Sequence, residues 1–396
     1  MWINVGTRHE KDSICGISHF IEHMLFKGTK NRTAKDISND IEYYGGQINA
    51  HTSHDHTCFY VKLPYYQLEN GIDVLSDILL NSVFDEEAIE KEKSVIIEEI
   101  KMSDDSAGEF LYETLLKKTF SNKGIGRNIL GSIDSVNSIN KESIKKYFKN
   151  HYIPERAVVV ATGKFDFEKL CDIVERKFST WENEGGIKNP EVESQTFNPC
   201  VYVRNKSDEQ VNIAIITQCP DDSNIKDFYA TRLLNIIFGS TSSSRLFQNI
   251  REDRGLCYSI YTDTNYYVGY GEFGIYTSVA RSNTKLVLDL LIEEIKKLKK
   301  DYITKEELDF AKEKCKGSLM LNMEDSSDIM MTIGEYEVVD ERMPKFEDIV
   351  SVIDSIDIDY VNGIIDMVFN EKISIGVIGK NVKKLINEED YINIWR

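Results

Sequence analysis

The sequence is poor in several features, and each shortage excludes a class of protein. Its seven cysteines never form a CxxC pair and are odd in number, which argues against a disulfide framework and against a thiolate zinc site. No apolar run is long enough for a membrane helix, and the first residues lack the basic start and apolar centre of a secretory signal. These shortages predict a soluble, cytoplasmic protein with free thiols.

Positive charge is scarce as well. The chain has 48 Lys and Arg residues against 66 Asp and Glu residues, which gives a net charge of −18 at pH 7. This charge repels phosphate backbones and anionic lipid surfaces, so we expect neither nucleic acid nor a membrane as a partner. We interpret the excess acid chiefly as solvated surface; the alternative is an acidic inner wall that attracts basic peptides.

The length and the hydrophobic pattern indicate two domains. At 396 residues the chain is too long for one ordinary core, and the stretch from Trp181 to Pro199 has the composition of a linker. Residues 156–170 and 372–385 both have the pattern of a buried strand, a glycine turn and a helix start, which indicates a diverged duplication. We expect each half to form a sheet backed by helices. The predicted helices include 285–300 and 305–320, the predicted strands 57–63, 211–217 and 271–277, and the predicted domains are 1–185 and 186–396.

The stretch SHFIEHMLF, residues 18–26, has helical character. A helix places His19 and His23 on one face, with Glu22 beside them, and this spacing suits one metal ion. Two imidazoles alone do not make a catalytic zinc site, which usually has three protein ligands and leaves the fourth position to water. The alternative is a helix whose histidines are only partly buried polar residues.

The third ligand is expected in a helix over residues 85–102, which begins at the capping residue Asp85. At 3.6 residues per turn, Glu92 and Glu99 share a stripe with apolar side chains. Two carboxylates in such a stripe are costly without a cation, and zinc would meet that cost. We assign Glu99 as the third ligand and Glu92 as a supporting or catalytic carboxylate. The apolar members of the stripe are Ala88, Ile89, Val95 and Ile96.

A second histidine group consists of His51, His54 and His56. On a strand, His54 and His56 would share a face, and a further metal site could be built there. No carboxylate or thiol accompanies them convincingly. We therefore interpret them as polar residues of a strand near the cleft, with substrate contact as the alternative.

Four segments make the chain resemble the insulinase or pitrilysin family of zinc metallopeptidases, and in particular its processing-peptidase-like, half-length bacterial branch. GISHFIEHMLFKGT carries the inverted HxxEH motif, and the 76 residues from His23 to Glu99 match the interval to the family's glutamate ligand. YYGGQINAHTSHDHTCFY resembles the stretch that leads into the family's peptide-pairing edge strand. FGSTSSSRLFQNIREDRGLCYSI resembles the family's signature for an arginine and a tyrosine seven residues apart.

The resemblance implies an α+β fold of two homologous domains, each with a mixed, largely antiparallel sheet backed by helices. It implies Zn²⁺ as the cofactor and Glu22 as the general base. Relatives usually carry one or two strands ahead of the stretch that begins here at Met1, so the first strands are expected to be missing or the first sheet trimmed. The implied zinc ligands are His19, His23 and Glu99.

The same resemblance implies how a peptide would be bound. Asn49, Ala50 and Thr52 would bind substrate from the edge strand through main-chain hydrogen bonds, so sequence selectivity should be modest. Arg251 and Tyr258 would reach the active site from the second domain, bind the substrate carbonyl and stabilise the developing oxyanion.

The expected function is a zinc-dependent endopeptidase for peptides or unfolded polypeptide segments, bound as an added edge strand in a closed chamber. Zinc would lower the pKa of its bound water towards about 7, and Glu22 would pass the proton to the leaving amine. We expect a homodimer in which Arg251 and Tyr258 of one chain complete the metal site of the other. The alternatives are a catalytically inactive scaffold subunit and a zinc hydrolase of a non-peptide substrate.

Overall fold

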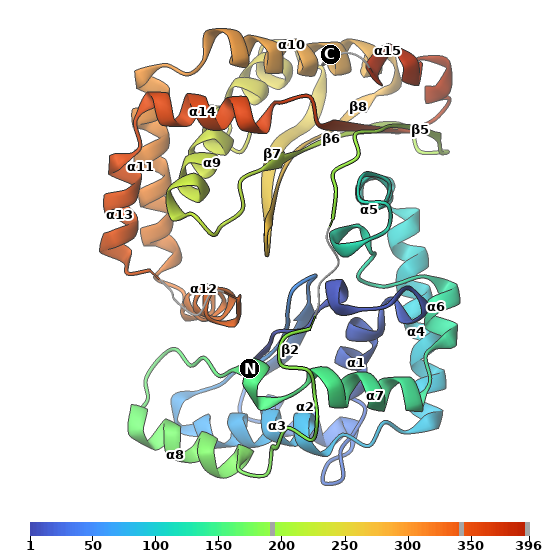
Figure 1. Ribbon diagram of the computed structural model, residues 1–396, viewed down its shortest axis with the longest axis vertical. Helices are drawn as coiled ribbons and strands as arrows, with labels where there is room; N and C mark the ends of the chain where they lie inside the picture. Colours follow the sequence, from blue (N-terminus) through green and yellow to red (C-terminus); the bar gives the residue numbers. More distant parts are fainter. Residues whose placement is uncertain (191–194, 340–343, 393–396) are drawn as a thin grey trace. The chain divides into compact units, whose positions relative to one another are not determined.

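The computed structural model of this chain describes residues 1–190, 195–339 and 344–392 (Figure 1). Its residues fall into two compact units, and neither unit is one continuous half of the sequence. Ser103–Gly126 belongs to the unit formed mainly by the second half, and Met323–Met343 belongs to the unit formed mainly by the first half. Unit 1 consists of Met1–Met102, Arg127–Ser194 and Met323–Met343; unit 2 consists of Ser103–Gly126, Gln195–Asn322 and Pro344–Arg396.

Unit 1 contains a four-stranded antiparallel sheet in the order β2-β3-β1-β4. Among the described strands β2 pairs only with β3, so its other side is an open edge. The strands are β1 (Trp2–Ile3), β2 (Gln47–Thr52), β3 (Thr57–Lys62) and β4 (Ala157–Val158). The helices are α1 (Ile17–Leu25), α2 (Ala34–Glu42), α3 (Leu68–Asn81), α4 (Glu86–Asp105), α6 (Ile133–Ser138), α7 (Lys141–His151), α8 (Phe167–Phe178) and α12 (Ser326–Val339).

The two faces of this sheet are covered by different parts of the sequence. Ile3 and Phe59 point into the main core of the unit, where they pack with Phe20 of α1. Trp2 points to the other face and is covered by α12. A Cβ atom on Gly334 of α12 would lie only 2.0 Å from the indole of Trp2. The helix can approach this tryptophan so closely only because residue 334 has no side chain.

Unit 2 contains a five-stranded mixed sheet in the order β5-β9-β6-β8-β7. Among the described strands of this sheet, only the β5–β9 pair is parallel. The strands are β5 (Val201–Asn205), β6 (Gln210–Cys219), β7 (Cys257–Tyr267), β8 (Tyr270–Ala280) and β9 (Ile373–Gly379). The helices are α5 (Ala107–Thr119), α9 (Ile225–Phe238), α10 (Thr284–Asp301), α11 (Lys305–Asn322), α13 (Phe346–Ser355), α14 (Ile358–Val368) and α15 (Glu388–Ile392).

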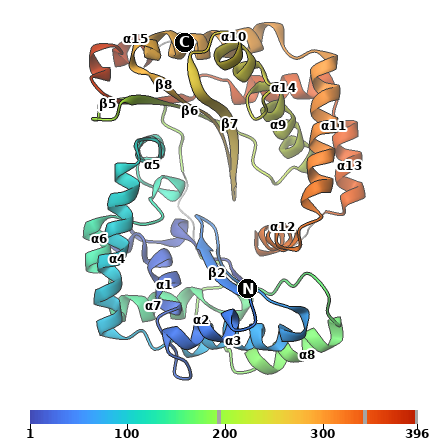
Figure 2. The same ribbon diagram turned by 180° about the vertical axis from the view of Figure 1, so that it is seen from behind.

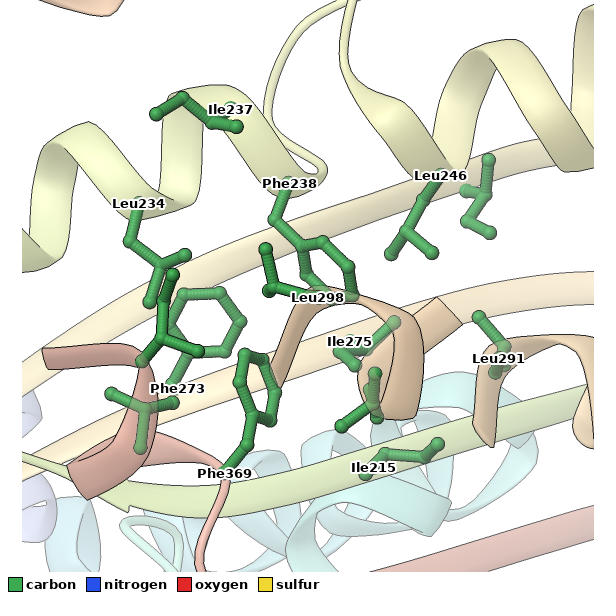
Figure 3. Close-up of a cluster of buried hydrophobic side chains, with 14 of the residues drawn as sticks. Ile215, Leu234, Ile237, Phe238, Leu246, Phe273, Ile275, Leu291, Leu298 and Phe369 are labelled. Atoms are coloured by element: carbon green, nitrogen blue, oxygen red, sulfur yellow. The ribbon is translucent and has the colours of Figure 1, made fainter. Parts of the chain in front are cut away.

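The main core of unit 2 lies between one face of this sheet and its helices (Figure 3). Phe369 packs edge to face on both Phe238 and Phe273, with ring centroids 5.3 and 5.5 Å apart. The opposite face is covered by α5, which packs on β6 and β9 (Figures 1 and 2). A Cβ atom on Gly376 of β9 would lie 2.7 Å from Leu111 of α5. Each sheet thus has one face covered by a helix from the other half of the sequence.

The structure confirms the expected α+β fold with sheets backed by helices. The five predicted helices and strands correspond to α10, α11, β3, β6 and β8. The predicted strand after Arg156 is correct only for two residues, because β1 offers only Trp2 and Ile3 as partners for β4. After β9 the chain forms a 3-10 turn at Val382–Lys384 and not an α-helix. The described residues of the predicted linker form neither helix nor strand, and residues 191–194 lie outside the described part of the chain.

Within the described residues, no helix has the length and apolarity that spanning a membrane requires.

Candidate metal centre

Helix α1 buries an apolar face and leaves the HxxEH side chains on its other side. Phe20 and Ile21 are fully buried, whereas His19, Glu22 and His23 are half-buried. The turn before α1 needs a glycine, because Gly16 adopts φ +90° and a Cβ atom there would lie 2.6 Å from the carbonyl oxygen of Leu130.

A buried carboxylate caps the start of this helix. Glu10 accepts hydrogen bonds from the main-chain N–H groups of Gly16 (2.6 Å) and Ser18 (2.8 Å). These are N–H groups that a helix leaves without an internal partner, and its positive end favours an anion. Burial nevertheless raises the pKa of Glu10 to about 7. Sequence inspection missed this residue, although an acidic side chain shortly before the motif was a usable signal.

Helix α4 supplies the carboxylates. It begins as predicted at Asp85, whose Oδ1 accepts the N–H of Ala88 at 3.0 Å. Ile89, Glu92 and Ile96 are buried along one face. Val95, an expected member of that stripe, is 44% exposed, so the buried face is rotated away from it and towards Glu92.

Side-chain atoms of His19, His23 and Glu99 converge. One ligand atom from each residue lies within 4.8 Å of the others, and no other group of three His, Cys, Asp or Glu residues does so in the described chain. The Nε2 atom of His23 is 3.8 Å from Glu99 Oε2. The spacing read from the two helices therefore does bring the three expected ligands together.

A hydrogen bond fixes the orientation of the second imidazole, that of His23. His23 Nδ1 donates to Glu92 Oε1 at 2.8 Å, and the other oxygen of Glu92 lies 2.7 Å from Lys27 Nζ. Burial alone would lower the pKa of His23, but the hydrogen bond to Glu92 and the charge of Glu99 outweigh it and raise that pKa. Burial would likewise raise the pKa of Glu92, yet its contacts with His23 and Lys27 lower it. Lys27 was not among the predicted site residues.

The donor set fits a zinc ion. Burial, helped by the neighbouring His23, lowers the pKa of His19 to about 3, so its imidazole is neutral near pH 7 and keeps a lone pair for a metal. Because Glu92 engages Nδ1 of His23, the Nε2 atom beside Glu99 is the one left to bind a metal. Two imidazoles and one carboxylate form a known catalytic zinc set, and they leave the fourth position to water.

Glu22 is held by a residue expected to act only through its main chain. The hydroxyl of Thr52 donates to Glu22 Oε2. Burial raises the pKa of Glu22, and this hydrogen bond partly opposes the rise. Thr52 therefore belongs to the surroundings of the expected general base.

Strand β2 presents main-chain groups to its open edge. Phe59 exchanges two hydrogen bonds with Met1, so its N–H and C=O groups face β1. These groups alternate sides along a strand, and Ala50 lies opposite Phe59 on β2, so the N–H of Ala50 faces the open edge. The side chain of Asn49 accepts this N–H at 2.9 Å. The edge is thus present, and in the free chain one of its donors is engaged locally.

The expected arginine and tyrosine lie together in unit 2. Arg251 lies in the helical turn Phe247–Glu252, and its guanidinium is 4.4 Å from the ring centroid of Phe247 and 5.6 Å from that of Tyr258. The side chain of Tyr258, at the start of β7, is 81% exposed. The pair is therefore preformed and accessible within its own unit.

The other histidines have ordinary structural partners. The rings of His51 and His56 pack around Trp2, with centroids 5.5 and 4.9 Å from it. His54 Nδ1 is hydrogen-bonded to the hydroxyl of Thr7 at 2.7 Å. These contacts account for the second histidine group without a metal.

Comparison with known proteins gives the family. The model of the insulinase family, peptidase family M16, matches residues 1–133, and that of the peptidase M16 inactive domain matches residues 138–315. A protein of Bacillus subtilis (strain 168) named as an uncharacterized zinc protease is 34% identical over 96% of this chain and 91% of its own length. This chain belongs to the insulinase family. The nearly full-length match places it in the half-length branch of that family.

Other proteins similar to this chain support the same family assignment. An uncharacterized zinc protease of Streptomyces coelicolor is 32% identical over 96% of this chain and 84% of its own length. Among solved structures, a protease from Helicobacter pylori has a TM-score of 0.88 at 22% identity, covering 96% of this chain and 92% of that chain. A peptidase M16 inactive domain from Pseudomonas fluorescens has a TM-score of 0.88 at 17% identity, with the same coverage. At these identities the structures establish the fold alone.

Proposed function

We propose that this chain is a zinc-dependent endopeptidase. The observation that carries the proposal is the convergence of His19, His23 and Glu99 within 4.8 Å, with Glu22 beside them on α1. Relatives named as zinc proteases support a peptidase-like role. Seven free cysteines fit an enzyme of the reducing cytoplasm.

The residues around the centre suit general-base catalysis. Bound zinc would supply an activated water and polarise the substrate carbonyl. Glu22 would accept a proton from the attacking water and return it to the leaving amine. Glu92 would keep the ring of His23 in one orientation throughout.

The proposed substrate is an extended peptide, or an unfolded segment of a longer chain, added to the open edge of β2. The outward N–H of Ala50 is a donor for its main chain, once the side chain of Asn49 has turned away. Recognition through main-chain groups gives modest sequence selectivity.

The proposed assembly is a homodimer with a closed chamber. In it Arg251 and Tyr258 of one chain bind the substrate carbonyl at the metal centre of the partner and stabilise the developing oxyanion. The exposure of Tyr258 and the stacking of Arg251 on its ring support a pair available to another chain.

Two measurements test the activity. Elemental analysis should find one zinc per chain, and a fluorogenic peptide panel should be cleaved by the purified protein but not after chelation. Absence of zinc would instead indicate a scaffold subunit, the role suggested by the match of residues 138–315 to a domain described as inactive. Bound zinc without cleavage of any peptide would point to a non-peptide substrate.

A further inference from the structure

Thr52 connects the open edge strand to the expected general base. It is the last residue of β2, and its hydroxyl donates to Glu22 Oε2 on α1, thirty positions away in the sequence. Both side chains are half-buried. Within the described residues this is the one side-chain hydrogen bond of Glu22.

The backbone of Thr52 is fixed by its neighbours. Thr52 pairs with Thr57 across the β2–β3 hairpin. The turn that follows is closed by the N–H of Ser53, which donates to His56 O at 2.8 Å, and by the N–H of His56, which donates to Ser53 Oγ at 3.0 Å. The hydroxyl of Thr52 is therefore a donor in a set position.

Without such a donor, the carboxylate of a glutamate can adopt several orientations. Its carboxylate moves with three torsions, and the last of them is broad. The nearby carboxylate of Glu99 repels that of Glu22. A base turned towards His23 would be misplaced, and small misplacements of a reacting group can reduce rates about a hundredfold.

We propose that Thr52 is a positioning residue for catalysis: it fixes Oε2 of Glu22 and so leaves Oε1 as the proton acceptor. This inference rests on the proposed peptidase function. Strand β2 would then have two roles. Its edge binds the substrate, and its last side chain, that of Thr52, positions the general base Glu22.

Three variants test the proposal. Thr52→Val keeps the shape of the side chain and removes the hydroxyl, and Thr52→Ser keeps the hydroxyl. Thr57→Val is the matched control, because it removes a threonine hydroxyl from the opposite position of the hairpin without touching Glu22. For Thr52→Val we expect kcat about tenfold lower, KM within twofold of wild type and one zinc per chain. Thr52→Ser should restore kcat, and Thr57→Val should change thermal stability but not kcat.

A second readout does not depend on activity. The infrared carboxylate band of Glu22, isolated as the difference between each zinc-free protein and the same protein carrying Glu22→Gln, should shift in Thr52→Val and not in Thr52→Ser. An unshifted band would refute the positioning of Glu22 by Thr52, and a shifted band with unchanged kcat would refute its role in catalysis. Wild-type protein that cleaves no peptide would refute the proposed function, and the band would then still decide whether Thr52 orients Glu22.

Discussion

His23 Nδ1 lies 2.8 Å from Glu92 Oε1, and Lys27 Nζ lies 2.7 Å from the other oxygen of the same carboxylate. A neutral imidazole that donates from Nδ1 has its lone pair on Nε2, the atom that faces Glu99. The hydrogen bond from His23 and the contact with Lys27 lower the pKa of Glu92 and keep its carboxylate ionised, although Glu92 is only 3% exposed. Two residues, Glu92 on α4 and Lys27 just after α1, thus prepare the expected metal ligand His23.

Removing this support should weaken zinc binding. We expect Glu92→Gln to reduce zinc affinity about 10- to 100-fold, because a ligand's hydrogen-bonded partner typically contributes that much. Lys27→Met should act in the same direction but less strongly. Competition with a chromophoric chelator measures both affinities. Lys101→Met is the control, since Lys101 pairs with the exposed Glu98 on the same helix. Equal affinity in all three variants would contradict the assignment.

The two remaining glutamates should separate binding from catalysis. Glu99→Gln should lose zinc because a ligand is removed, whereas Glu22→Gln should keep zinc and lose nearly all peptidase activity because only the base is removed. Elemental analysis and a fluorogenic peptide assay on both variants check this. Equal zinc loss in the two, or activity that survives Glu22→Gln, would show that the roles are wrongly assigned.

The convergence of His19, His23 and Glu99 could be predicted because it depends on helical periodicity. His19 and His23 are four residues apart on α1, and Glu92 and Glu99 are seven apart on α4, so their faces follow from 3.6 residues per turn. The wrong placement of Val95 shows the limit of this periodicity. Val95 lies at the margin of the stripe, where burial depends on which element packs against α4.

The supporting contacts could not be predicted, because they join elements whose approach is decided by tertiary packing. Lys27 follows α1 and reaches Glu92 only because α1 and α4 lie side by side. Thr52 reaches Glu22 from a strand whose register places its side chain on the α1 face. The sequence also did not predict that α5 and α12 each belong to the unit formed mainly by the other half of the chain. Periodicity does not indicate which sheet a helix covers.

Proline should have different effects at two neighbouring positions of β2, Ala50 and His51. Ala50→Pro removes an N–H that faces away from β3, so we expect KM to rise about threefold to tenfold with little change in melting temperature. His51→Pro removes an N–H that faces β3 and should lower the melting temperature clearly. Thermal melts and Michaelis–Menten kinetics compare the two. Similar melting temperatures would mean that the edge is wrongly oriented.

Unit 2 contains a carboxyl group whose burial should make stability depend on pH. Glu272 is fully buried and accepts hydrogen bonds from Tyr276 OH (3.1 Å) and Asn265 Nδ2 (3.3 Å), and burial raises its pKa from 4.5 to about 7. The folded state therefore holds this proton more tightly than the unfolded state. The associated stability is fully present below pH 4.5 and is lost as the pH rises through about 7.

The variant Glu272→Gln should lack this dependence. Relative to the variant, the wild type should lose up to about 3 kcal/mol of unfolding free energy between pH 4.5 and pH 8. Urea denaturation of both proteins at these two pH values measures the difference. A constant difference between them would show that Glu272 does not titrate in this range.

The proposed dimer can be tested by mixing two inactive chains. Glu22→Gln and Tyr258→Phe should each be nearly inactive alone, because the first lacks the base and the second a donor to the oxyanion. In a mixed dimer one centre combines an intact Glu22 with an intact Tyr258, so activity should reappear after subunit exchange. Native mass spectrometry verifies that mixed dimers form. Their formation without activity would mean that both motifs act within one chain.

The packing of Gly334 on Trp2 affects how the protein is made. Trp2 is synthesised about 330 residues before Gly334. At 5–20 residues per second this delay is roughly 15–65 seconds, during which the apolar face formed by Trp2 and Cys58 has no α12 to cover it. A nascent chain in this state offers a surface of the kind that chaperones bind. A gene split between its halves would give two products that each lack a helix of their own unit.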